Sequence, residues 1–174
     1  MRAQGLCGAW HQPAGRVLQV SGRVAAVARH DFRNLSADRV YQAWTDPALL
    51  RRWMADHLRQ QDEDAAITRI EVDAVVGGRF CFADTREGSE AWGYYEALER
   101  PERIVFSWFV SSDEEQEDKS DVAIEITPAG PGCAVTATHT MSDEWADYVD
   151  RTAAAWRSML QSIDATLTVR AEVT

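Results

Sequence analysis

The sequence predicts a single α+β domain in which a curved antiparallel sheet of six or seven strands wraps around a long C-terminal helix. Three observations support this architecture. Residues 142–167 carry one apolar stripe at spacings of three and four, which corresponds to roughly six helical turns. Several segments between residues 70 and 140 alternate apolar and polar side chains, as half-buried antiparallel strands do. A length of 174 residues with 45% apolar residues suits one domain with a substantial core.

The N-terminal part of this domain is expected to contain one strand and two short helices. The segment from Val24 to Asn34 has extended character and is predicted to be the first strand. Ser36 and Asp46 are good N-cap residues, and Pro47 suits the first position of a helix. The apolar stripes of the two helices are Ala37, Val40, Tyr41 and Trp44, followed by Leu49, Leu50, Trp53 and Met54.

Six further strands and the last helix complete the prediction. The strands are expected at residues 70–74, 80–82, 91–98, 104–110, 122–127 and 135–140. Turns at Gly77-Gly78, at Arg100-Pro101 and over 128–132 separate some of them. Ser142 is predicted to cap the last helix, whose first turn holds Asp143 and Glu144. Carboxylates are favourable there because the helix dipole is positive at that end.

The first 22 residues differ from the rest of the chain. They mix glycines and Pro13 with the isolated residues Cys7 and Trp10, and they show no helical or strand period. Residues 1–22 are therefore predicted to be a flexible extension, and residues 23–170 a single domain.

Charge and cysteine content restrict the partners and the cellular location. A formal net charge of -10 repels phosphate groups, so neither nucleic acid nor an anionic membrane is an expected partner. The three cysteines are far apart and form no metal or disulfide pattern, which favours a reducing cytoplasm. The sequence also shows no apolar run long enough for a membrane span and no secretory signal. A homodimer through an exposed strand edge is possible.

Four local strings connect the sequence with a known group of proteins. They are AWTDPALLRRWM from Ala43, VVGGRFCF from Val75, the stretch from Gly93 to Trp108 that ends in PERIVFSW, and TATHT from Thr136. With this order of elements, the chain resembles the START-like or SRPBCC superfamily over roughly residues 24–167, and within it the AHSA-type family of homologues of the activator of heat-shock protein 90 ATPase.

The resemblance implies a fold but not one activity. It implies the helix-grip fold, in which the long helix closes a groove or cavity against the sheet. Members of the superfamily include lipid and hormone carriers, polyketide aromatases and cyclases, and chaperone activators. The function must therefore be argued from the site.

Aromatic side chains on the inward faces of the strands and of the last helix are the candidate ligand-binding residues. They are Phe80, Phe82, Trp92, Tyr95, Phe106, Trp108, Trp145 and Trp156. Each of them taken singly is more often a simple core residue. Seven tryptophans and nine other aromatic residues are nevertheless a bulky filling for a closed core. Because Tyr94 and Tyr95 are adjacent, the sequence does not decide which of the two faces inward.

His139 is the one candidate catalytic residue, since it lies in a predicted strand beside the long helix and could act as a general base. A hydrogen-bonded structural histidine is the alternative. Neither a metal site nor a bound cofactor is expected from the residue pattern. The acidic segment 111–120 could bind a basic surface or a cation, but it is expected to be a solvated loop.

Three classes of function follow from these features. The first is a binding module that takes a small hydrophobic or aromatic molecule between the sheet and the last helix. The second is a protein-interaction module of the chaperone-activator type, whose partner would be a chaperone or another protein. The third is an enzyme of the cyclase or aromatase type that uses His139 or a tyrosine hydroxyl to carry protons.

Overall fold

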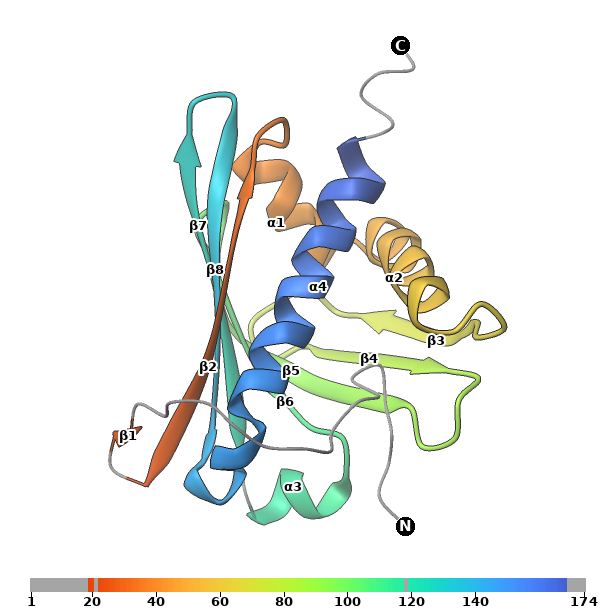
Figure 1. Cartoon of the computed structure of the whole chain (residues 1–174), viewed down its shortest axis with the longest axis vertical. Helices are drawn as coiled ribbons and strands as arrows, with labels where there is room; N and C mark the ends of the chain where they lie inside the picture. The colour runs from red at the N-terminus through yellow and green to blue at the C-terminus, as the bar shows by residue number, and fades with distance from the viewer. Residues whose placement is uncertain (1–18, 21, 118, 169–174) are drawn as a thin grey trace.

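One antiparallel sheet forms the framework of the molecule. In the computed structural model of the protein, residues 19–20, 22–117 and 119–168 are described (Figure 1). The sheet has eight strands in the order β1-β2-β8-β7-β6-β5-β4-β3. The strands are β1 (Gln19–Val20), β2 (Arg23–Phe32), β3 (Ile67–Val72), β4 (Arg79–Asp84), β5 (Glu90–Glu99), β6 (Arg103–Trp108), β7 (Ser120–Ala129) and β8 (Gly132–Ser142). Apart from the two-residue β1, they are the seven predicted strands.

Three of the helices lie on the inner side of this curved sheet. Two short helices, α1 (Ala37–Thr45) and α2 (Pro47–Gln61), follow β2, and the long helix α4 (Val149–Thr168) ends the described chain. Figure 1 shows α4 running along the inside of the sheet with α2 beside it. The predicted α+β helix-grip architecture is confirmed. No helix in the described part of the chain is long and apolar enough to cross a membrane.

The predicted caps of the two short helices are present. The Ser36 hydroxyl accepts a hydrogen bond from the Arg39 N–H at 3.2 Å, so that one free donor of the first turn of α1 is satisfied. The Asp46 carboxylate accepts from two backbone N–H groups at the start of α2, at 2.8 and 3.1 Å. Local sequence rules therefore predicted these helix starts correctly.

The last helix begins differently from the prediction. Ser142 does act as an N-cap, but residues Asp143–Tyr148 form a 3₁₀ helix, η1, and the α-helix begins at Val149. In a 3₁₀ helix, side chains three residues apart are eclipsed. Trp145 and Tyr148 use this geometry to pack edge to face, with ring centroids 5.3 Å apart.

The acidic segment 111–120 also differs from its prediction as a solvated loop. Residues Ser112–Glu117 form a short helix, α3. The Ser111 hydroxyl accepts from the Glu114 N–H at 3.3 Å, and the Glu114 carboxylate accepts from the Val110 N–H at 3.0 Å. These two bonds close the first turn, which a count of like charges does not reveal. Asp118 lies outside the described residues.

The predicted extension over residues 1–22 is described only in part. Residues 1–18 and 21, and with them Cys7, lie outside the described residues. Gln19 and Val20 pair with Val24 and Arg23 at the edge of the sheet. The domain limits of residues 23–170 stay a prediction.

The core fills the space between the inner face of the sheet and the helices. Its main cluster joins α1, α2 and α4 to strands β2 and β4 to β8, and a smaller cluster of Val24, Ala26, Met141 and Val149 lies under η1. Gly93 in β5 permits close packing at one point of the main cluster. A Cβ atom there would lie 1.8 Å from the Ser107 carbonyl oxygen and 2.7 Å from the Phe80 ring.

Candidate ligand-binding site

Six of the eight predicted ligand-binding residues meet in the core. They are Phe80 and Phe82 from β4, Tyr95 from β5, Phe106 and Trp108 from β6, and Trp156 from α4. Alternation along each strand brings these side chains to the inner face. Each of them is at most 6% exposed.

The rings form a continuous series of contacts. Phe80 stacks on Phe82 with ring centroids 5.0 Å apart and meets Phe106 edge to face at 5.2 Å. Trp108 meets Trp156 edge to face at 5.4 Å, which joins the rings of the sheet to those of α4. Such edge-to-face and offset arrangements suit the quadrupoles of aromatic rings.

Two further tryptophans extend this group, and the sequence interpretation had placed them only on helix stripes. Trp44 of α1 lies 6.0 Å from Trp156 and 5.2 Å from Trp53 of α2, measured between ring centroids. The signal that could have found them is the apolar stripe of each short helix, because such a stripe must face the sheet. These two residues and the six above are called the ring cluster below.

Tyr95 connects the ring cluster to α1. Its hydroxyl donates a hydrogen bond to the Trp44 carbonyl oxygen at 3.1 Å. Burial raises the pKa of Tyr95 well above its usual value, so the hydroxyl stays protonated at neutral pH. The structure thereby decides which of the two adjacent tyrosines faces inward.

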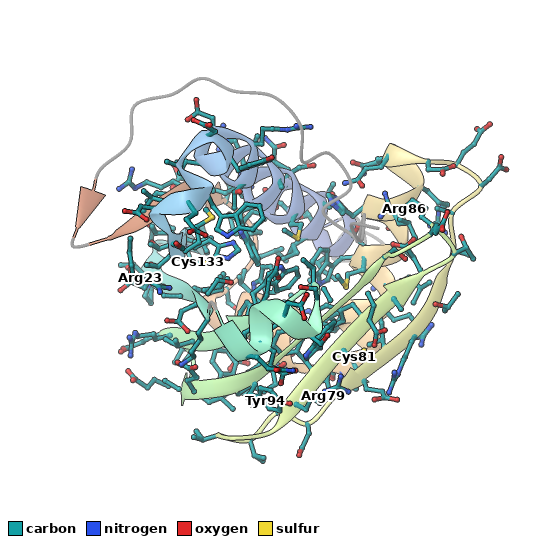
Figure 2. All side chains as sticks on the ribbon, turned by 90° about the horizontal axis from the view of Figure 1, so that it is seen from below. Arg23, Arg79, Cys81, Arg86, Tyr94 and Cys133 are labelled. Atoms are coloured by element: carbon teal, nitrogen blue, oxygen red, sulfur yellow. The ribbon has the colours of Figure 1, made fainter. Side chains whose placement is uncertain are left out.

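Trp92 and Tyr94 lie on the opposite, outer face of the sheet. Trp92 packs near Phe109 with ring centroids 6.4 Å apart. Its Nε1–H donates to one carboxylate oxygen of Glu115 at 3.1 Å, and the Tyr94 hydroxyl donates to the other oxygen at 2.9 Å. Figure 2 shows Tyr94 of β5 beside Arg79 of β4. The structure does not bring Trp92 to the ring cluster, and its predicted ligand contact stays a prediction.

Trp145 also lies apart from the ring cluster. It belongs to η1 and packs against the smaller core cluster under that element, together with Ala146 and Ala153. Its predicted ligand contact likewise stays a prediction.

His139 is buried in β8 beside Trp156. The Trp156 Nε1–H donates to His139 Nδ1 at 3.1 Å, so the ring proton of neutral His139 is on Nε2, 3.1 Å from the Ser120 hydroxyl oxygen. That hydroxyl in turn donates to the Trp108 carbonyl oxygen at 2.7 Å. Burial, assisted by the positive charge of Arg23, lowers the pKa of His139 to about 3.

These contacts favour the structural role of His139 over the catalytic one. The lone pair that a general base would use already accepts the Trp156 proton, and a pKa of about 3 is far from the neutral range where a base works best. The catalytic role stays a prediction.

The other two described histidines connect helices to their neighbours. His57 of α2 is buried, with Nδ1 2.9 Å from the Ser162 hydroxyl of α4 and Nε2 2.8 Å from the Gln61 amide. Burial, with a smaller effect of Arg86, lowers the pKa of His57 to about 4. His30 Nε2 lies 2.7 Å from the Asp164 carboxylate. Among the described residues, no three His, Cys, Asp or Glu side chains are grouped as metal ligands.

A surface hollow of about 480 Å³ lies between α2 and α4, away from the ring cluster. It is lined by Arg52, Asp56, Arg59, Gln60, Ala165 and Thr166. Arg52 donates to the Thr166 carbonyl oxygen at 3.1 Å, and Asp56 accepts from the Thr166 hydroxyl at 2.9 Å. None of the ring-cluster residues lines this hollow.

Residues 34–168 match the protein family described as activator of Hsp90 ATPase homolog 1-like protein. The chain belongs to this family. The resemblance that the sequence strings predicted is thus confirmed for the Hsp90 ATPase activator homologue family. No curated protein matches the chain.

Solved structures with a similar fold come from several bacteria. Protein Ms6760 from Mycobacterium smegmatis has a TM-score of 0.65 and 18% identity, with 89% of this chain and 97% of that chain covered. Protein MLL2253 from Mesorhizobium loti has a TM-score of 0.64 and 16% identity, with 83% and 96% covered. Protein Mll3558 from Rhizobium loti has a TM-score of 0.62 and 24% identity, with 83% of this chain and 96% of that chain covered. At these identities the similarity concerns the fold.

Proposed function

We propose that this chain binds a small apolar or aromatic molecule between the inner face of the sheet and α4. The observation that carries the proposal is the ring cluster, which gathers eight aromatic side chains from three strands and three helices in one buried region. Ligand sites are mostly apolar and contain few polar groups. The neutral His139 and the hydroxyl of Tyr95 are polar groups of this kind at the edge of the cluster.

Native mass spectrometry tests this proposal on protein purified gently from its own source. We expect a mass surplus under native conditions that disappears when the protein is denatured, and the size of the surplus would give the ligand class. Trp108→Leu, which removes a central ring, should reduce the surplus, whereas Tyr94→Phe, on the outer face of the sheet, should retain it. If the protein carries no surplus and binds none of a panel of added aromatic compounds, the proposal is wrong.

A protein-interaction role is the second candidate. The description of the family names an activator of the Hsp90 ATPase, and a formal net charge of -10 would complement a basic face on a partner. Capture experiments with the immobilised chain should then recover an Hsp90-type chaperone at low salt and less of it at moderate salt. Failure to recover a chaperone at either salt concentration would count against this role.

A cyclase or aromatase reaction is not part of the proposal. It would need His139 or a tyrosine hydroxyl to carry protons. Both ring nitrogens of His139 and the hydroxyl of Tyr95 are already engaged in hydrogen bonds within the protein. Turnover by a His139→Ala variant of any substrate that is found would test this directly.

A further inference from the structure

The indole N–H of Trp44 is a fully buried donor in the ring cluster that has no hydrogen-bond acceptor among the described residues. Buried indole N–H groups usually have a hydrogen-bond acceptor. Trp53 donates to the Ala43 carbonyl oxygen at 2.8 Å, and Trp156 donates to His139 at 3.1 Å. Trp44 is only 5% exposed, and its Nε1 is buried without an acceptor among the described residues.

The rings next to Trp44 do not supply the missing hydrogen-bond acceptor. Its ring lies between those of Trp53 and Trp156, at centroid distances of 5.2 and 6.0 Å. An aromatic face is a weak acceptor for an N–H group compared with an oxygen atom. An oxygen brought next to Nε1 by a bound molecule would therefore form the stronger bond.

We propose that the Trp44 N–H is the polar anchor of the bound molecule, and that this molecule is a neutral aromatic compound with a hydrogen-bond acceptor such as a ketone oxygen. This inference rests on the function proposed above and adds the ligand chemistry. The N–H donor selects an acceptor, and the surrounding rings select a flat apolar body.

The charges around the ring cluster favour a neutral ligand. Among the described buried residues the charged one is Asp84, which forms an ion pair with Arg86 at 2.9 Å. None of these buried residues is a lysine or arginine, and Arg151, which has a buried Nη1 atom, lies near the start of α4 and outside the ring cluster. His139 cannot supply a positive charge either, because Trp156 occupies the nitrogen that would take the second proton. A charged ligand would thus lose its hydration without gaining a counter-ion.

A pair of probe compounds of nearly equal shape tests the anchor. 2-Acetylnaphthalene carries a carbonyl oxygen, and 2-isopropylnaphthalene has a methyl group in its place. Equilibrium dialysis with the full chain should give about 3- to 10-fold tighter binding of the acetyl compound, which is the usual net effect of one hydrogen bond. In Trp44→Phe this ratio should fall to about one, because the donor is gone while an apolar ring remains.

Trp53→Phe is the matched control. It also shortens a tryptophan of the ring cluster, but its N–H is already bonded to Ala43, so the ratio of the two affinities should stay that of the original protein. The ratio within one protein cancels changes in packing. Benzothienylalanine at position 44, which has sulfur in place of the N–H in a ring of similar size, replaces Trp44→Phe if that variant does not fold.

The outcomes separate the two proposals. Binding of both probes with equal affinity, or a preference that survives in the Trp44 variants, would overturn the anchor and leave apolar ligand binding intact. Binding of neither probe to the folded protein would overturn the anchor and would weigh against the proposed function as well. A preference that is lost only in the Trp44 variants would support both.

Discussion

At the scale of single residues, two buried histidines give the protein a predictable response to acid. The pKa values of His139 and His57 are lowered to about 3 and about 4, mainly by burial, whereas an unfolded histidine has a pKa of about 6.5. Below pH 6.5 the unfolded chain therefore binds more protons than the folded one. The stability from these two residues is fully present above pH 6.5 and is lost as the pH falls towards their folded pKa values.

We expect the free energy of unfolding to fall by about 2 kcal/mol for each histidine between pH 7 and pH 5. Urea unfolding followed by tryptophan fluorescence at several pH values measures this change. His57→Asn, which keeps a polar group near Ser162, should lose about half of the pH dependence. A free energy that stays constant from pH 7 to pH 5 would show that neither histidine is buried in its neutral form.

The sequence could predict most of the aromatic residues that lie in the core, Trp92 being an exception, but not which polar atoms stay unpaired. Alternation along the strands is enough to place Phe80 and Phe106 on the inner face. The partner of an indole N–H depends on atoms far apart in the chain, as in the bond from Trp156 to His139 across 17 residues. The missing acceptor of the Trp44 N–H can therefore be recognised only from the packing of α1, α2 and α4 in the structure.

At the scale of elements, Glu115 joins α3 to the outer face of the sheet. Glu115 accepts from the Trp92 indole at 3.1 Å and from the Tyr94 hydroxyl at 2.9 Å. All three groups are accessible to solvent, so these bonds contribute little to global stability. They can nevertheless determine how often the short helix opens, because local opening depends on a few exposed contacts.

Glu115→Ala should accelerate amide hydrogen exchange in residues 110–117 several-fold and change the free energy of global unfolding by less than about 1 kcal/mol. Hydrogen exchange with mass spectrometry measures both the segment and the rest of the chain. Asp113→Ala removes an exposed carboxylate from the same helix and serves as the control, with exchange close to that of the original protein. Equal exchange in both variants would mean that Glu115 does not hold α3.

The elements that the sequence predicted well have local causes, whereas the missed helix α3 also depends on contacts with a distant strand. The starts of α1 and α2 depend on the caps Ser36 and Asp46, which lie next to the helices they begin. By contrast, α3 is held by bonds to strand β5, which lies about twenty residues earlier in the chain. A short acidic segment has no periodic apolar signal that would reveal such contacts.

At the scale of the whole molecule, the helix-grip fold could be predicted because the sheet and the last helix each have an apolar face that must be buried. Each predicted strand had one apolar face and the last helix had one long stripe, so packing the helix on the sheet was the simplest way to bury both. The sequence could not determine whether the aromatic residues close the core or line a ligand site, since both arrangements use the same alternation. The ligand-binding role therefore depends on experiment and not on the fold.

Trp156 is the point at which the sheet and α4 are expected to hold together most strongly. It is 1% exposed, its ring lies 5.4 Å from Trp108 and 6.0 Å from Trp44, and its N–H satisfies His139. Trp156→Ala should lower the free energy of unfolding by about 3–5 kcal/mol, because it opens a cavity and leaves the His139 nitrogen without its donor. Chemical denaturation at neutral pH measures this loss.

Two other variants show which part of the loss comes from position and which from the N–H group. Trp145→Ala removes the same side chain from the half-buried η1 and should cost only about 1–2 kcal/mol. Trp156→Phe keeps a ring in the core but removes the donor to His139, so its cost should lie between the other two. If Trp145→Ala cost as much as Trp156→Ala, the helix would be held along its whole length and not mainly through the ring cluster. The ring cluster would then contribute less to holding α4 on the sheet. Its aromatic side chains could in that case move apart more easily around a bound molecule.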